Sequence, residues 1–151
     1  MLNKKFWDNP AGVWLAFVAL ALLTLAWCMQ AYSLMNWEHA VKLGLQNESF
    51  TGDAVERAWA LESRGLAIAD MIWPLPLCII AFAGLIRRRF YGFAAGLMGL
   101  AIGVYFPIFF AFQRWATYRE TAVAALVLWT IPSLLGIAGL WTNRKEFTGN
   151  I

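Results

Sequence analysis

Four long apolar runs constrain the fold of this chain more than any other feature of its sequence. They cover about residues 11–35, 66–86, 90–113 and 121–141, which is more than half of the 151 residues. A membrane-spanning helix needs about 20 predominantly apolar residues, and each run meets that length. Only 14% of the residues are charged, whereas a soluble domain carries about 25%. The sequence therefore predicts an all-α polytopic membrane protein, a four-helix transmembrane bundle that forms a single domain over residues 1–151.

The third run carries a stripe of glycines. Gly92, Gly96, Gly99 and Gly103 recur at spacings of four and three, so a helix places all four on one face. GxxxG pairs let two helix backbones approach closely in lipid, because no side chain holds them apart. The same face continues to Arg114, so the packed side of this helix carries a charge at its end. The stripe predicts close packing within the chain, and also a possible contact in a homo-oligomer or a larger membrane complex.

The basic residues predict how the chain is oriented. Arg87, Arg88 and Arg89 form the strongest signal, because positively charged turns between spans stay on the cytoplasmic side. The other ends on that side are basic as well, at Lys4, Lys5, Arg144 and Lys145. We expect both termini in the cytoplasm, in a plasma membrane and specifically a bacterial inner membrane. The net charge of +3 comes without a basic patch on a folded face, so nucleic-acid binding is not expected.

The connection 36–65 is the longest between spans, and it carries most of the acidic residues. Asp53 follows a Thr-Gly break and has Glu56 three residues later, which is typical of a helix N-terminus. The residues after Asp53 gather their apolar side chains on one side. The pattern predicts a short extracytoplasmic amphipathic helix that rests on the membrane surface or the bundle mouth, or runs directly into the second span.

Prolines predict where the spans bend, and tryptophans predict where they reach the membrane interface. Pro74 and Pro76 should kink the second span and free backbone carbonyls, and Pro132 should bend the fourth. Indole rings favour the membrane interface, which fits tryptophans near the span ends at Trp7, Trp37, Trp115 and Trp141.

Polar side chains within the spans concentrate toward the outer end of the bundle. The depth of each residue along its span follows from a rise of about 1.5 Å per residue. Six residues lie by this measure in or just above the outer third of the bilayer. A charge in hydrocarbon costs about 2.5–3.5 kcal/mol at mid-membrane, so the acid of this group needs a partner. The acid is Asp70, and the nearest basic partner for it is Arg114. Tyr105 is a weaker alternative because it does not fall on the glycine stripe. The six candidate ligand-binding residues are Gln30, Asp70, Trp73, Pro107, Gln113 and Arg114.

This constellation has two interpretations. It is a small pocket, open to the outer leaflet, for a lipid headgroup, a quinone-like ring or a small amphiphile. Alternatively it is an interhelical polar clamp that fixes the packing of the first three spans, which is the interpretation that we favour from the sequence. No histidine or second acid lies beside Asp70 or Arg114 in the sequence, so the case for acid–base catalysis is weak.

The remaining reactive residues indicate no cofactor and no metal. His39 is the only histidine, and one histidine beside Glu38 does not make a metal site. Cys28 and Cys78 lie at different predicted depths and are interpreted as small apolar fillers. The sequence has no GxSxG, HExxH or phosphate-loop motif.

The function that we expect is therefore a non-enzymatic integral membrane protein, which is either an accessory subunit or a module that binds lipid or another hydrophobic ligand at the outer leaflet. The alternative is a small lipid-modifying membrane enzyme or transporter that uses Asp70 and Arg114.

Overall fold

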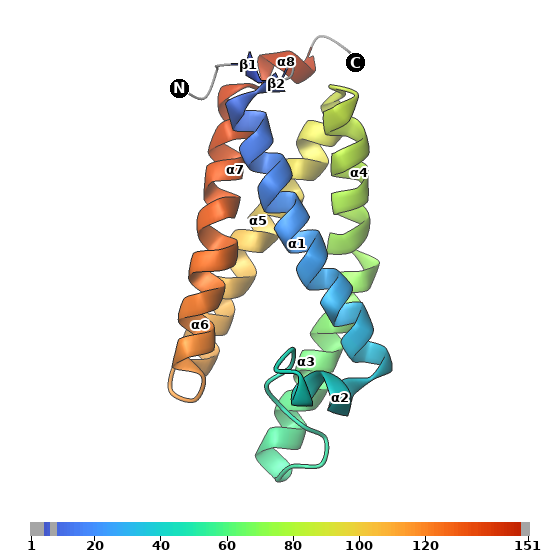
Figure 1. The fold of residues 1–151 in the computed structure, drawn as a ribbon, viewed down its shortest axis with the longest axis vertical. Coiled ribbons are helices and arrows are strands. Elements are labelled where there is room, and N and C mark those ends of the chain that lie inside the picture. The colour runs from blue at the N-terminus through green and yellow to red at the C-terminus, as the bar shows by residue number, and fades with distance from the viewer. Residues whose placement is uncertain (1–4, 7–8, 149–151) are drawn as a thin grey trace. The chain divides into compact units, whose positions relative to one another are not determined.

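The computed structural model describes residues 5–6 and 9–148, and the regular structure of this part of the chain is helical apart from one pair of two-residue strands (Figure 1). The elements are β1 Lys5–Phe6, β2 Asn9–Pro10, α1 Ala11–Met35, α2 Trp37–Lys42, α3 Ala54–Ile72, α4 Pro74–Ile86, α5 Phe90–Arg114, α6 Arg119–Ala125, the π-helical turn η1 Leu126–Thr130, α7 Ile131–Thr142 and α8 Lys145–Thr148. Strands β1 and β2 pair antiparallel. The predictions for Lys4 and Trp7 lie outside the described residues.

Four helices are long and apolar enough to cross a membrane, which confirms the predicted all-helical class. They are Ala11–Met35, Ala54–Ile86, Phe90–Arg114 and Arg119–Thr142, and the second and fourth of these contain more than one helical element. The chain divides into two compact units. The first combines Met1–Leu23 with Leu77–Ile151, and the second is Thr24–Pro76.

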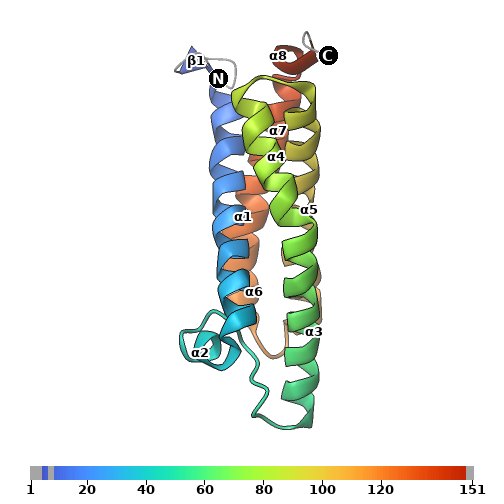
Figure 2. The ribbon, with the colours of Figure 1, turned by 90° about the vertical axis from the view of Figure 1, so that its right-hand side faces the viewer.

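Glycines hold the helices of the first unit close together. A Cβ on Gly92 would overlap the backbone of Gly84, so α4 and α5 touch main chain to main chain, side by side as in Figure 2. A Cβ on Gly139 would likewise overlap the backbone of Gly12, which joins α7 to the start of α1. Further along α5, Gly99 faces Leu20 and the sulfur of Cys78. The predicted glycine stripe is thus buried against other helices of the same unit.

Two prolines act differently on the helices of this unit. α5 continues through Pro107, whereas Pro132 follows the π-helical turn η1. In that turn the N–H of Ile131 donates to the carbonyl of Leu126, five residues back. A proline ring clashes with the carbonyl four residues before it, and a wider turn relieves this clash. The bend expected at Pro132 is therefore preceded by a local change of helix type.

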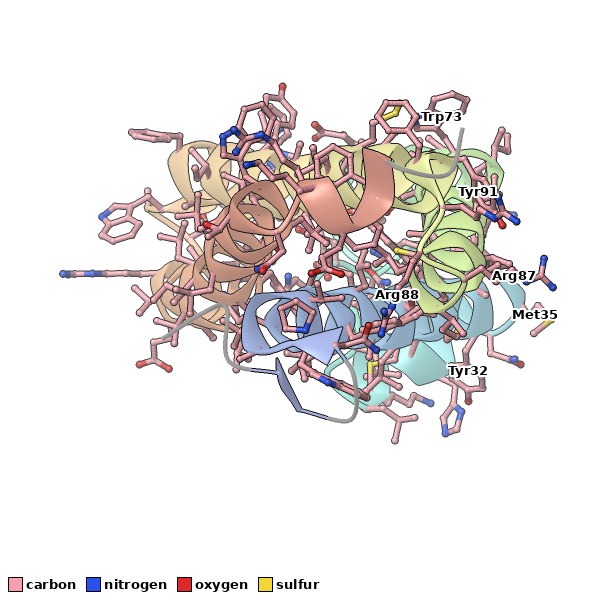
Figure 3. All side chains as sticks on the ribbon, turned by 90° about the horizontal axis from the view of Figure 1, so that it is seen from above. Tyr32, Met35, Trp73, Arg87, Arg88 and Tyr91 are labelled. Atoms are coloured by element: carbon pink, nitrogen blue, oxygen red, sulfur yellow. The ribbon has the colours of Figure 1, made fainter. Side chains whose placement is uncertain are left out.

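A tight turn of arginines joins α4 to α5. Arg88 has a positive φ of 52°, and the N–H of Arg89 donates to the carbonyl of Gly84 at 2.8 Å. Arg87 is exposed and extends away from the helices (Figure 3).

In the second unit, α3 begins where the sequence predicted a helix. The Asp53 side chain accepts hydrogen bonds from the backbone N–H groups of Val55 and Glu56, both at 2.9 Å. The helix then runs without interruption to Ile72, so the segment expected to be amphipathic is the first part of α3. It ends there because Pro74 and Pro76 follow, and the connecting Trp73 leaves helical geometry with φ −120° and ψ −65°.

Candidate functional site

The six predicted site residues divide between the two units. Gln30, Asp70 and Trp73 belong to the second unit, and Pro107, Gln113 and Arg114 belong to the first. The geometry of each group is described within its own unit.

The acid of the second unit lies on the packed face of α3. Ala60, Ser63, Ala67 and Asp70 follow each other at spacings of three and four and therefore share this face. The two alanines are fully buried, and Ser63 and Asp70 are half-buried. Among the described residues of its unit, the Asp70 carboxyl has no hydrogen bond or ion pair. It is a half-buried carboxyl near the end of an amphipathic helix, without a protein partner in its own unit.

The end of α3 adds further polar groups beside Asp70. Prolines carry no N–H, so Pro74 and Pro76 give no hydrogen bond to the carbonyls of Asp70 and Ile72, four residues before each. The backbone N–H of Trp73 donates to Ala69 at 3.0 Å. The side chain of Trp73, a predicted ligand-binding residue, is 57% exposed and extends away from its helix (Figure 3). The helix is interrupted at this residue, which takes Trp73 out of register with α4.

The side chain of Gln30 is hydrogen-bonded to the connection. Its side-chain oxygen accepts a hydrogen bond from the Nε2 of Gln46, 16 residues later in the chain. This contact holds the connection against α1, whereas the predicted clamp was to join the first three spans.

A second set of polar contacts organises the connection itself and could not be predicted from the sequence. The Glu38 carboxylate accepts from the Ser49 hydroxyl at 2.6 Å and from the Phe50 N–H at 2.8 Å. The N–H of Ser49 donates to the Glu56 carboxylate at 2.9 Å. Because these partners lie 7 to 12 residues apart, no local pattern predicts them. These hydrogen bonds hold α2, the connection and the first turn of α3 together.

Trp37 and Glu48 form the buried centre of that body. The indole N–H of Trp37 donates to the Glu48 carbonyl at 2.9 Å, and its ring packs on Phe50 with centroids 5.3 Å apart. Glu48 is only 1% exposed, and its carboxylate accepts from the Ser63 hydroxyl at 3.2 Å. Trp37, which the sequence places near the membrane interface, is buried within the unit by these contacts with the Glu48 carbonyl and the Phe50 ring.

In the first unit, two adjacent residues of α5 have opposite environments. Arg114 is only 4% exposed and lies on the same face as the buried Pro107, as the stripe predicted. Gln113 is exposed, because consecutive residues of a helix point about 100° apart. The exposed Tyr105, on the other side of the helix, agrees with its place off the glycine stripe.

Two buried hydroxyl groups of the first unit have no hydrogen-bond partner among the described residues. They belong to Thr130 in η1 and to Ser133 in α7. Ser133 packs so closely on Gly103 that a Cβ on the glycine would overlap its hydroxyl. We interpret this as a weak contact between the Gly103 Cα–H and the hydroxyl oxygen, which recurs between closely packed helices.

No group of three or more His, Cys, Asp or Glu side chains that could hold a metal ion occurs in the described part of the chain. The exposed His39 contacts the Tyr32 hydroxyl through its Nδ1 at 2.5 Å.

Comparison of the chain with protein-family models, with curated proteins and with solved structures gave no match.

Proposed function

We propose that the chain is a non-enzymatic integral membrane protein that binds a lipid or another hydrophobic ligand with a polar headgroup. The observation that supports this proposal is the Asp70 carboxyl. It lies in a helix of membrane length and has no hydrogen bond or ion pair among the described residues of its unit. Ionisable groups in membrane helices are costly unless they are paired, so a donor from outside the unit stabilises this one.

The length of the helix supports a site near one membrane surface. Ala54–Ile86 has 33 residues, whereas a span needs about 20 residues to cross the hydrocarbon core. Counted along the sequence from an arginine turn at the cytoplasmic edge, about the first 13 of these residues lie beyond the opposite edge. By this count Asp70 lies just inside the outer edge of the hydrocarbon.

The composition of the first part of α3 supports its assignment as the extracytoplasmic amphipathic helix. Arg57, Glu62 and Arg64 are exposed on it, and so are Val55 and Leu61. This mixture suits the interface between headgroups and water. With both termini cytoplasmic, in an inner membrane of bacterial type, Asp70 faces the outer leaflet.

Extraction of the full chain in a mild nonionic detergent tests the proposal. Mass spectrometry of the intact complex should detect a bound amphiphile on the wild type and on Glu62→Gln, a control on the same helix. It should be lost from Asp70→Asn. Retention of the same molecule by Asp70→Asn would contradict the proposal. A co-purifying protein lost from this variant would instead identify an accessory subunit, and conversion of the bound molecule would identify an enzyme.

Self-association through the glycine stripe is a separate proposal. Gly92, Gly96, Gly99 and Gly103 each face another helix of the first unit, so a second copy would have to replace contacts that already exist. We therefore place any contact with a second copy or a larger complex on the remaining faces of the bundle. Analytical ultracentrifugation in detergent compares the oligomeric mass of the wild type with that of Gly99→Ala. It shows whether the stripe contributes to self-association.

A further inference from the structure

We propose that the end of the first unit that carries the arginine turn binds the headgroups of anionic phospholipids. This contact is independent of Asp70 and goes beyond the proposed function. Two segments far apart in the chain bring basic residues to this end, the turn between α4 and α5 and the start of α8 (Figure 1). Clusters of about four to eight Lys and Arg at the ends of membrane-spanning helices are typical of binding to anionic lipid. The basic residues of the two segments are Arg87, Arg88, Arg89, Arg144 and Lys145.

An aromatic contact holds these two segments together. The ring of Phe147 in α8 is buried and stacks on the ring of Phe93, with the two centroids 5.7 Å apart. Phe93 lies about one helical turn after Arg89, the residue that precedes α5. The contact therefore fixes α8 beside the start of α5, so that the basic residues of both segments border the same end of the unit.

The positive charge at this end is not neutralised within the unit. The side chains of Arg87 and Arg89 are exposed and have no hydrogen bond or ion pair among the described residues. The described part of the unit contains two acids, Glu146 in α8 and Glu120 in α6. Glu120 follows α5, a helix about 37 Å long, and therefore lies at its opposite end. Five basic residues thus share this end with Glu146, which leaves it with a net positive charge.

The guanidinium of Arg144 is held beside the last turn of α7. Its Nη1 donates to the carbonyl of Trp141 at 3.2 Å, and its Cζ lies 5.4 Å from the centroid of the Trp141 ring. This ring is exposed, and exposed indoles at the ends of spans favour the membrane interface. Arg144 therefore places its charge at the depth of the lipid phosphates, which a planar guanidinium can bind through two hydrogen bonds.

Exposed apolar side chains beside the arginines favour a phospholipid over a soluble anion. Ile86 and Phe90 directly flank the three arginines of the turn, and both are exposed. Tyr91 is exposed as well and lies on the same side of α4 as Arg87 (Figure 3). A soluble anion would contact the arginines alone, whereas a phospholipid offers its phosphate to the arginines and its acyl chains to the apolar side chains. The mixture of charged and apolar side chains at this end is complementary to such a molecule.

Defined lipids test the inference on the full chain. The protein is placed in bilayers of equal parts phosphatidylglycerol, which is anionic, and phosphatidylcholine, which has no net charge. It is then extracted in nonionic detergent, and the lipids that stay bound are counted by mass spectrometry of the intact complex. One basic residue near an anionic membrane contributes about fivefold to binding. The wild type should therefore retain phosphatidylglycerol at least about fivefold better than phosphatidylcholine, and high salt should screen this preference.

The variants remove the charges in turn. Arg87→Gln combined with Arg89→Gln should lose most of the preference, and Arg144→Gln should weaken it by up to about fivefold. Arg119→Gln is the matched control, because Arg119 packs over the Trp115 ring with its Cζ 5.2 Å from the centroid but lies beyond the opposite end of α5. This control should keep the preference of the wild type. An equal loss in Arg119→Gln and Arg144→Gln would overturn the inference, because the preference would then depend on net charge alone.

Further results also decide the outcome. Equal retention of both lipids by the wild type at low salt would overturn the inference, because arginines that only orient the chain during insertion give the purified protein no lipid preference. If inorganic phosphate abolishes the preference and chloride at the same ionic strength does not, this end binds the free ion instead of the lipid. If the double glutamine variant does not elute as a folded species in gel filtration, the salt dependence of the wild type and Arg144→Gln still decide.

The inference and the proposed function fail separately. Asp70→Asn should keep its phosphatidylglycerol, because Asp70 belongs to the other unit and takes no part in this contact. The tests of Asp70 are therefore made with phosphatidylcholine, for which the arginine end has no preference.

Discussion

Gly84 of α4 and Gly92 of α5 face each other without any side chain between them, and a Cβ on either would overlap the other's backbone. This contact sets how closely α4 and α5 pack, and it follows directly from the arginine turn that reverses the chain between them.

Gly92→Ala should therefore destabilise the protein. Overpacking a close contact costs about 1–3 kcal/mol, and here the opposing atoms are main chain, which cannot rotate away. The measurement is the unfolding free energy in mixed micelles. Gly65→Ala is the matched control, because a Cβ at Gly65 meets nothing within 4 Å. An alanine there should stabilise α3 by about 0.5–1 kcal/mol. Equal effects of the two substitutions would show that α4 and α5 are not packed as described.

Glu38→Ala should open the connection between α2 and α3. The substitution removes the acceptor for the Ser49 hydroxyl and for the Phe50 N–H, and hydrogen bonds to a charged group contribute about 1.5–3 kcal/mol each. Limited proteolysis should cut this connection faster in the variant than in the wild type. Glu62→Ala, also an exchange of an acid in this unit, should leave the rate of cutting unchanged, and a rise in both variants would point to general loosening.

Ser133→Ala should be neutral or slightly stabilising, although Ser133 is fully buried. Its hydroxyl has no hydrogen-bond partner among the described residues, so the substitution removes a polar group that burial leaves unsatisfied. The thermal midpoint in detergent checks this. A loss of more than about 1 kcal/mol would mean that the hydroxyl makes a hydrogen bond, for example to a buried water molecule.

Helical periodicity predicted much of the packing. The glycine stripe on α5 is buried against other helices of its unit, and its face continues to the buried Arg114. Tyr105 is exposed because it falls off that stripe. A residue's face within a regular helix depends only on its position along the chain, which is why the sequence was sufficient here.

The sequence failed where regular helix geometry ends. The helix is interrupted at Trp73, so a count of residues across the prolines does not predict which way this side chain points. Trp37 is buried through a hydrogen bond to the Glu48 carbonyl, and Gln30 is held by Gln46. These contacts join residues 11 and 16 positions apart, and only the folded connection brings them together.

The clamp and the ligand site make different predictions about Asp70 and Arg114. A clamp between these two side chains predicts that Asp70→Asn and Arg114→Gln are coupled by about 1 kcal/mol or more in a double-mutant cycle of stability. If Asp70 is satisfied by a ligand instead, the two effects should add within about 0.5 kcal/mol. Unfolding in lipid-free detergent measures the cycle, with Arg114→Lys to separate loss of charge from loss of packing.

The most direct test is the stabilisation of the purified protein by an added phospholipid. A ligand that binds only the folded state raises its stability in proportion to the logarithm of ligand concentration. We predict that the thermal midpoint of the wild type rises by several degrees and keeps rising with lipid, whereas that of Asp70→Asn stays constant. An equal rise in both proteins would contradict the claim that Asp70 is satisfied by a ligand from outside the chain.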